Sequence, residues 1–200
     1  MNGATLSTDR NGEAGSAYSF DGNDFVAIPD SSLLEYEAGS SLSISAWIKV
    51  SDIASTGVIY SNYRCIDANL DLAVGGGPHT IGFTTRDSIG RENDTKRLNW
   101  PINDSSLDQW IHLTGVRDYA AERVSFYING TLVVTEADAR TGAFSRPGAR
   151  GQHWIGAAGS CGNPFAPQFH FTGNIDDVRI YDRALPEQEV ADLYEAEQPI

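Results

Sequence analysis

Tyrosine, arginine and histidine side chains that could bind or cleave a polysaccharide occur between residues 63 and 153. The candidates are Tyr63, Arg64, His79, Arg86 and His153. A guanidinium group can neutralise the carboxylate of a uronic acid, and a tyrosine or histidine can accept a proton, which together is what a polysaccharide lyase needs. The same groups can hold sugar hydroxyls without any reaction. The residue types therefore favour a carbohydrate ligand and leave both binding and cleavage open.

Trp100 is the aromatic residue best placed to stack on a sugar ring. It lies in a polar stretch, residues 96–101, that has the composition of a loop. Sugar rings pack their C–H faces against flat aromatic side chains. We therefore expect Trp100 to form the platform of a binding site, with an anchor over an open sheet edge as the structural alternative.

Motifs of several other chemistries are absent from the sequence. A retaining glycosidase needs two carboxylates about 5 Å apart, and no Glu-x-Asp-x-x-Glu string that would place them on one strand occurs. The four histidines and two cysteines lack the short spacings of a zinc site. There is also no phosphate-binding loop and no Gly-x-Ser-x-Gly elbow.

The overall charge limits the partners. The 200 residues include 27 acidic and 14 basic side chains, for a formal net charge of −13. This balance argues against a general nucleic-acid binder or a protein that binds anionic membranes. No apolar run is long enough to cross a bilayer, so we expect no membrane insertion. Ten of the 14 basic residues fall within residues 64–150, where an anionic ligand would be least repelled.

Cys65 and Cys161 are the only cysteines in the chain. A single pair can form one disulfide in an oxidising compartment or remain as two thiols in a reducing one. We expect the disulfide, and the sequence leaves the alternative open.

The hydrophobic pattern has a period of two, which is typical of β-strands. Leu42, Ile44 and Ile48 alternate with polar residues, and Asn129-Gly130 between two alternating runs predicts a hairpin with a type I′ turn. At least ten short strands separated by turn residues predict an all-β, antiparallel two-sheet sandwich. Residues 185–194 predict one short C-terminal helix. We expect a single domain over residues 1–200, with 1–14 and 196–200 as flanking or linker segments.

Five segments in this order resemble the laminin-G-like branch of the concanavalin A-like lectin/glucanase superfamily. They are residues 17–29, 42–48, 110–113, 126–130 and 173–186, the last with the string Asn-Ile-Asp-Asp-Val-Arg-Ile-Tyr. The resemblance covers nearly the whole chain and implies a jelly-roll sandwich. It specifies function much less, because this fold hosts binding modules, adhesion domains and enzymes.

The resemblance also implies a structural calcium ion, with Asp21, Gly22, Asp24 and Asp176 at its site. Independently, Asp176 has the same parity in its strand as Val178, which predicts that its side chain points into the core. A buried carboxylate needs a cation or several hydrogen-bond donors, and calcium prefers oxygen ligands. Backbone donors or a nearby arginine could fill the same need without a metal.

These observations together predict a non-catalytic carbohydrate-binding module, stabilised by calcium, in a secreted or cell-surface protein. We expect a polysaccharide as its partner, an acidic one being an option, and a larger multidomain protein around it. The first alternative is a polysaccharide lyase or glycosidase on the same jelly roll. The second is an adhesion domain that binds another protein.

Overall fold

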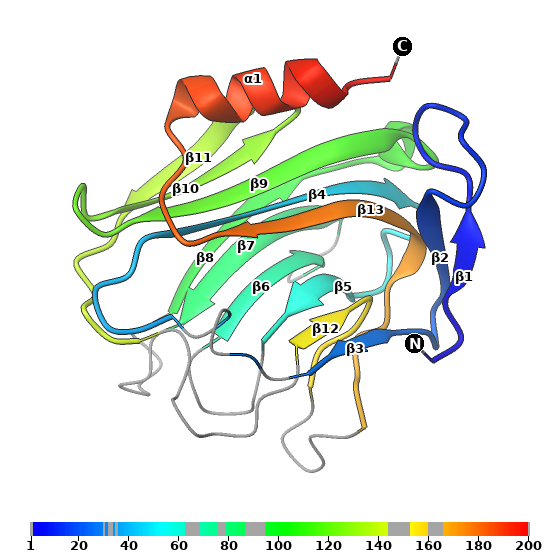
Figure 1. Ribbon diagram of the computed structural model, residues 1–200, viewed down its shortest axis with the longest axis horizontal. Helices are drawn as coiled ribbons and strands as arrows, with labels where there is room; N and C mark the ends of the chain where they lie inside the picture. Colours follow the sequence, from blue (N-terminus) through cyan, green and yellow to red (C-terminus); the bar gives the residue numbers. More distant parts are fainter. Residues whose placement is uncertain are drawn as a thin grey trace.

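The protein is a sandwich of two antiparallel β-sheets with one C-terminal helix, as a computed structural model describes it (Figure 1). The structure describes residues 2–29, 31, 34, 36–62, 69–75, 79–86, 95–143, 153–159 and 166–199. Within these residues one sheet has seven strands and the other six, and neighbouring strands pair antiparallel throughout. The predicted all-β jelly-roll class is confirmed.

The strand order brings the beginning and the end of the chain together. The seven-stranded sheet has the order β1 (Thr5–Ser7), β2 (Ala17–Asp21), β13 (Thr172–Tyr181), β4 (Leu42–Val50), β9 (Trp110–Asp118), β10 (Arg123–Ile128) and β11 (Thr131–Ala137). The six-stranded sheet has the order β3 (Val26–Ile28), β12 (His153–Ile155), β5 (Gly57–Ser61), β6 (Asn69–Val74), β7 (Thr80–Arg86) and β8 (Thr95–Pro101). Residues 5–7, in the segment expected to flank the domain, therefore form an edge strand of a sheet.

The core lies between the sheets because alternate residues of each strand turn inward. On β4, Leu42, Ile44 and Ile48 are fully buried there, and Leu72 and Phe83 face them from β6 and β7. Burying side chains of this size contributes roughly 1.5–3 kcal/mol each. The hairpin between β10 and β11 turns at Asn129 and Gly130, with φ values of 49° and 72°, which confirms the predicted type I′ turn.

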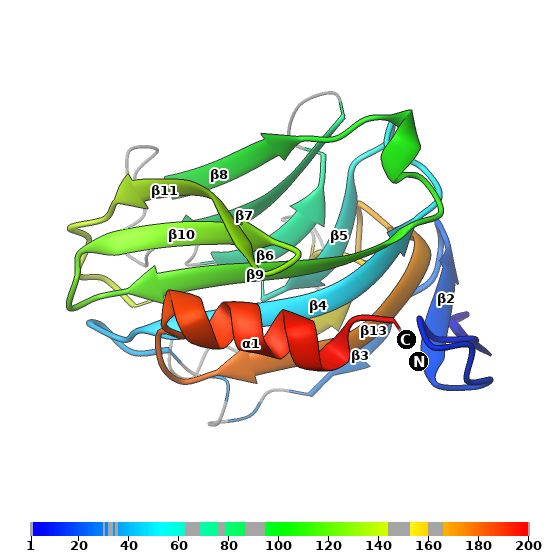
Figure 2. The same ribbon diagram turned by 90° about the horizontal axis from the view of Figure 1, so that it is seen from above.

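The helix α1 (Glu187–Glu197) lies on the outer face of the seven-stranded sheet (Figures 1 and 2). Its Val190 is buried with Leu185 against Val116 and Tyr127 of the sheet. Both faces of β4 are therefore covered: the indole of Trp47 is 1% exposed and stacks on Tyr194 of α1. Within the described residues no helix is long and apolar enough to cross a membrane.

A buried cluster of charges holds β7 and β9 to the segment that follows β11. The carboxylate of Asp138 accepts hydrogen bonds from Arg117 Nε at 3.0 Å and from Arg140 Nε at 2.5 Å. The side chains of Arg117 and Asp138 are completely buried. Arg140 in turn donates to the carbonyl of Thr85 at 2.7 Å and to its hydroxyl at 2.5 Å. Thr85 lies on β7 between Thr84 and Arg86, whose side chains face outward. The cluster therefore also holds the part of β7 that positions these two residues.

Candidate ligand-binding groove

A groove of about 360 Å³ lies on the outer face of the six-stranded sheet. The six-stranded sheet is on the opposite side of the sandwich from α1 (Figure 1). Its floor comes from the outward residues of β6, β7 and β8, which alternate with core residues such as Leu72, Phe83 and Leu98. Its described lining residues are Thr56, Val58, Asp71, Ala73, Gly75, Gly82, Thr84, Arg86, Thr95, Arg97, Asn99, Ala158 and Phe169. The period of two that builds the core thus also builds a polar surface behind it.

Strand register arranges the floor in rows that run across the strands. Asp71 pairs with Thr84, and Thr84 pairs with Arg97, so a carboxylate, a hydroxyl and a guanidinium lie side by side. In the next row Gly82 pairs with Asn99. A Cβ atom at Gly82 would lie 2.5 Å from Asn99 Oδ1, so the glycine makes room for the amide above the floor.

Phe169 forms an aromatic wall of the groove. Its side chain is 50% exposed, and its backbone carbonyl accepts a 2.8 Å hydrogen bond from the N–H of Val58 on β5. The backbone of Phe169 is left-handed, with φ of 56°, which is unfavourable for a bulky residue. Strained residues of this kind concentrate at ligand sites. Phe169 offers an aromatic surface next to polar groups, the combination that sugar rings use.

The groove contains charges of both signs. Asp71 is hydrogen-bonded through Oδ1 to the hydroxyl of Ser61. Arg86 and Arg97 form no ion pair with any described residue, and the Nε of Arg86 is buried without a hydrogen-bond partner there. Arg86 pairs in register with Thr95, so the two arginines are diagonal neighbours on the same face.

Asp176 does not point into the core, and the prediction from its parity is wrong. The register of β13 against β4 shifts between Asp176 and Arg179, and Asp177 has a left-handed φ of 46°. This β-bulge changes the parity of the strand, so Ile180 faces the core while Asp176 lies opposite Trp47 on the outer face.

Arg10 is the partner of Asp176. Its Nη1 lies 2.6 Å from Asp176 Oδ2 and its Nη2 lies 2.8 Å from Asp177 Oδ2, while Nε donates to the carbonyl of Glu197 at 2.6 Å. Its guanidinium also lies 4.9 Å from the centre of the Trp47 ring. Burial raises the pKa of Asp176, the charge of Asp177 raises it further, and Arg10 offsets part of the effect. Segments expected to be linkers therefore take part in the sandwich.

The four positions predicted for calcium do not form one site. Asp21 pairs with Thr172, four residues before Asp176 on β13, which places the two aspartates roughly 13 Å apart along the strand. Asp21, Gly22 and Asp24 form the turn between β2 and β3, where Asp24 Oδ2 accepts the N–H of Asp21 at 2.9 Å. Among the described residues no group of three or more His, Cys, Asp or Glu side chains could hold a metal. Asp176 is therefore too far away to share a calcium ion with the turn. Of the predicted ligands, the carboxylates of Asp21 and Asp24 lie in the turn itself.

Residues 20–191 match the family model of the concanavalin A-like lectin/glucanases superfamily, in its laminin-G-like form. The chain belongs to this superfamily. The match covers most of the chain and confirms the resemblance that the five sequence segments indicated. Compared by sequence with curated proteins, the chain shows no significant match.

Solved structures with this superfamily fold include toxin binding domains and a pentraxin. The binding domain of Paraclostridial Mosquitocidal Protein 1 has a TM-score of 0.72 and 16% identity, over 97% of this chain and 46% of that chain. The binding domain of botulinum neurotoxin serotype G has a TM-score of 0.68 and 18% identity, over 98% and 47%. The heptameric SAP-like pentraxin from Limulus polyphemus has a TM-score of 0.64 and 21% identity, over 90% and 82%. This chain spans about half the length of the two toxin domains, and at these identities the likeness shows the fold alone.

Of the predicted ligand-binding residues that the structure describes, Arg86 is the one that lies in the groove. Trp100 is not among the described lining residues. It belongs to β8 rather than to a loop, and there it lies opposite Ile81 with the parity of the buried Leu98. Its side chain, 39% exposed, is therefore on the other face of β8 from Asn99. The predicted platform and the groove do not coincide.

The two predicted histidines also lie outside the groove lining. His79 is exposed in the turn before β7, with φ of 58°. His153 is buried on β12, where its Nδ1 lies 2.6 Å from the hydroxyl of Tyr60, and the two rings stack. This pair belongs to the interior of the sandwich. Tyr63, Arg64, Cys65 and Cys161 lie outside the described residues, so the predicted disulfide stays a prediction.

The sequence analysis did not single out Phe169, Asp71 or Asn99. The alternation of Arg97 and Asn99 with Leu98 was a usable signal, because it marks a strand with a polar outer face. Phe169 gives no such signal. It lies in an irregular segment before β13, which reaches the groove through the hydrogen bond between the Phe169 carbonyl and β5 and through the pairing of Gln168 with Ala158.

Proposed function

We propose that the chain is a carbohydrate-binding module that holds a glycan in the groove of the six-stranded sheet. The observation that carries the proposal is the half-exposed Phe169 beside a floor of Thr84, Asn99 and two arginines. An aromatic face packs on the sugar ring, while hydroxyl, amide and guanidinium groups bind its hydroxyls. The fold supports the proposal only as a suitable scaffold, because it hosts several functions.

Binding rather than cleavage is the function that the described lining residues support best. They include one carboxylate, Asp71, whereas a glycosidase mechanism of the usual kind uses two. They include no histidine, tyrosine or lysine that could act as the base of a lyase next to Arg86. The test of the proposal must nevertheless measure products as well as binding.

The experiment is isothermal titration calorimetry of the purified chain against soluble oligosaccharides from glucans, galactans and uronans. Phe169→Ala should weaken binding of the active glycan by about tenfold, which corresponds to about 1.4 kcal/mol for one stacked ring. Trp100→Ala is the matched control, because it removes a similarly exposed aromatic from the other face of β8, and it should leave the affinity unchanged.

Equal affinity of the wild type and Phe169→Ala would overturn the assignment of the groove. Release of reducing ends or of unsaturated products that absorb at 235 nm would replace the binding module with an enzyme. Failure of every glycan to bind would favour the adhesion alternative.

We also propose that a calcium ion binds the turn at Asp21, Gly22 and Asp24. Two carboxylates lie there, and a Cβ atom on Gly22 would be 3.0 Å from Thr172 Oγ1, so a third oxygen is close. Oxygen ligands of this kind suit calcium. A chelator should lower the melting temperature of the wild type, and Asp24→Asn should abolish this effect. Asp176→Asn should keep it, because Asp176 is distant; an equal melting temperature with and without chelator would contradict the proposal.

A secreted or cell-surface location within a larger protein completes the proposal, since extracellular polysaccharides are met there. An antibody raised against the domain should detect a polypeptide longer than 200 residues in the medium or on intact cells of the source organism. A signal confined to the cell interior would contradict the location.

A further inference from the structure

We infer that the ligand of the groove is an anionic glycan, whose carboxylate or sulfate group is bound between Arg86 and Arg97. This inference rests on the proposed function and adds the charge of the ligand to it. Both acidic groups offer oxygens to a guanidinium in the same way, so the shared chemistry is what the site would recognise.

The first argument is that most of the other described arginines are neutralised, the exposed Arg123 on β10 being the exception. Arg10, Arg117, Arg140, Arg179 and Arg183 each lie against a carboxylate. Arg86 and Arg97 differ, because no described carboxylate lies within ion-pair distance of either. In a chain with a net charge of −13, two adjacent guanidinium groups on the floor of a groove, neither paired with a described carboxylate, are a local concentration of positive charge.

The second argument is the position of the two groups. Arg86 of β7 and Arg97 of β8 are diagonal neighbours on one face of an antiparallel pair, a spacing of roughly 7–8 Å between backbone positions. Side chains as long as arginine can converge across that distance. Two forked donors meeting at one point suit an anion with two or three oxygens better than a neutral hydroxyl.

The third argument is the buried Nε of Arg86, which has no hydrogen-bond partner among the described residues. A buried donor without an acceptor is unfavourable, because the group has lost its water without replacement. An oxygen of the ligand that reaches this nitrogen would remove that cost. Among the described residues, the groove therefore leaves this donor without an acceptor.

The charges also give the ligand a direction. Asp71 lies on β6, and its carboxylate would repel an anion from that side of the floor, so the acidic group belongs at β7 and β8. Phe169 contacts β5 through its carbonyl, three strands away from β8. Strands are spaced about 4.8 Å apart, so the backbones of β5 and β8 are separated by about 14 Å. The ligand is therefore an oligosaccharide, with its acid on a different ring from the one that stacks on Phe169.

The test compares glycans that differ only in charge. Oligogalacturonate and its methyl ester form one pair, and a sulfated galactan oligosaccharide and its desulfated form make the other. By calorimetry, the charged member of at least one pair should bind at least tenfold more tightly than its neutral partner. Preference within the first pair identifies a carboxylate ligand, and preference within the second identifies a sulfate.

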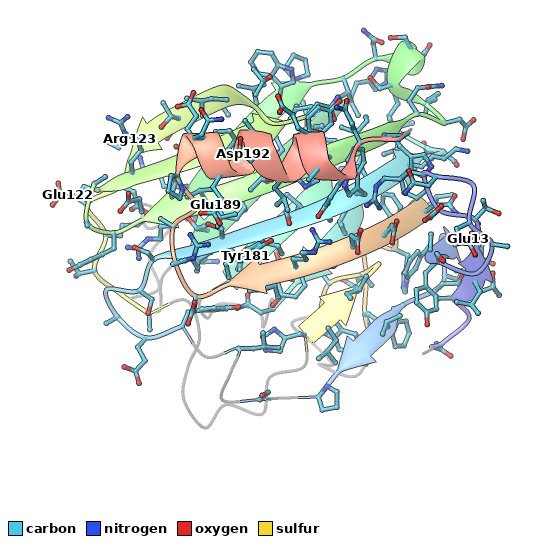
Figure 3. The ribbon with its side chains drawn as sticks, turned by 45° about the horizontal axis from the view of Figure 1, so that its top comes forward. Glu13, Glu122, Arg123, Tyr181, Glu189 and Asp192 are labelled. Carbon is cyan, nitrogen blue, oxygen red and sulfur yellow. The ribbon has the colours of Figure 1, made fainter. Side chains whose placement is uncertain are left out.

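Arginine variants connect that preference to the site. Arg97→Gln, at an exposed position, should reduce the affinity for the charged glycan about tenfold, to that of the neutral one. Arg86→Gln should do the same, with its melting curve checked because the residue is partly buried. Arg123→Gln is the matched control, since Arg123 is exposed on β10 of the other sheet (Figure 3), and it should leave the affinity unchanged.

The two levels of the proposal fail in distinguishable ways. If neutral and charged glycans bind equally and Phe169→Ala weakens both, the groove is correct and the anionic ligand is overturned. An unchanged affinity in Arg97→Gln and Arg86→Gln would also overturn it. If no glycan of either pair or of the wider panel binds, the proposed function fails as well.

Discussion

Asp138→Asn removes the negative charge that Arg117 and Arg140 share inside the protein. Arg117 and Asp138 have side chains with 0% exposure, and Arg140 is 10% exposed. Removing one partner from a buried ion pair costs roughly 3–5 kcal/mol, because the remaining charge has neither water nor a counter-ion. In a chain of this size that loss corresponds to a melting temperature lower by roughly 6–20 °C.

Urea unfolding followed by tryptophan fluorescence measures this loss directly. Glu189→Gln is the control, because it breaks the Arg183–Glu189 pair on the exposed side of α1 (Figure 3), where the two side chains are 51% and 44% exposed. Exposed pairs contribute at most about 1 kcal/mol. A loss in Asp138→Asn no larger than that in Glu189→Gln would refute the argument that burial makes the cluster important.

The pH dependence of the same variant is a second check. Burial by itself would raise the pKa of Asp138, but the hydrogen bonds and charges of Arg140 and Arg117 outweigh it and hold the pKa below its ordinary value. A carboxyl with a lowered pKa stabilises the fold above its unfolded pKa of about 4, and this contribution disappears as the pH falls through the folded value. The difference between wild type and Asp138→Asn should therefore narrow in acid. A constant difference from pH 7 downward would contradict the ion-pair account.

Two further predictions concern the outer face beneath α1. Burial, with the charges of Arg179 and Arg10, lowers the pKa of His112 to about 4, so the unfolded chain takes up a proton between pH 6.5 and 4 that the folded chain does not. His112 should therefore contribute about 3 kcal/mol to the stability that the wild type loses between pH 7 and pH 4.5. His112→Phe, which keeps an aromatic ring at the position next to Trp47, should lose less than the wild type by about that amount in urea unfolding at the two pH values; equal losses would contradict this. The pKa of Asp176 is raised, chiefly by burial, so its ionised form does not stabilise the fold and wild-type stability falls as the pH rises through that pKa. Asp176→Asn should accordingly cost less than Asp138→Asn at pH 7 by the same measurement, and a larger cost would show that Arg10 depends on this carboxylate.

The sequence predicted the strands whose alternation is regular and whose ends carry clear turn residues. Leu42, Ile44 and Ile48 mark β4, and Asn129-Gly130 marks the β10–β11 turn, because these features depend only on local backbone geometry. The family resemblance rested on the same local segments and was confirmed.

The candidate site was harder to predict, for reasons that differ between residues. Asp176 was placed on the wrong face because a single extra residue at the bulge changes parity, and the sequence does not reveal where a strand bulges. Trp100 was expected in a loop but lies in β8, because a strand with many polar residues resembles a loop in sequence. Its side chain therefore faces away from the groove. Phe169 depends on a contact with β5, more than one hundred residues earlier, which no local pattern contains.

The left-handed backbone of Phe169 has a consequence for attempts to engineer this domain. Glycine adopts φ near 56° without steric conflict, so Phe169→Gly removes an unfavourable conformation together with the aromatic wall. A library screened for heat resistance alone would therefore enrich glycine at position 169, and its most stable members would lack the aromatic wall of the groove. Selection at this position should be made on ligand binding first and on thermal tolerance second.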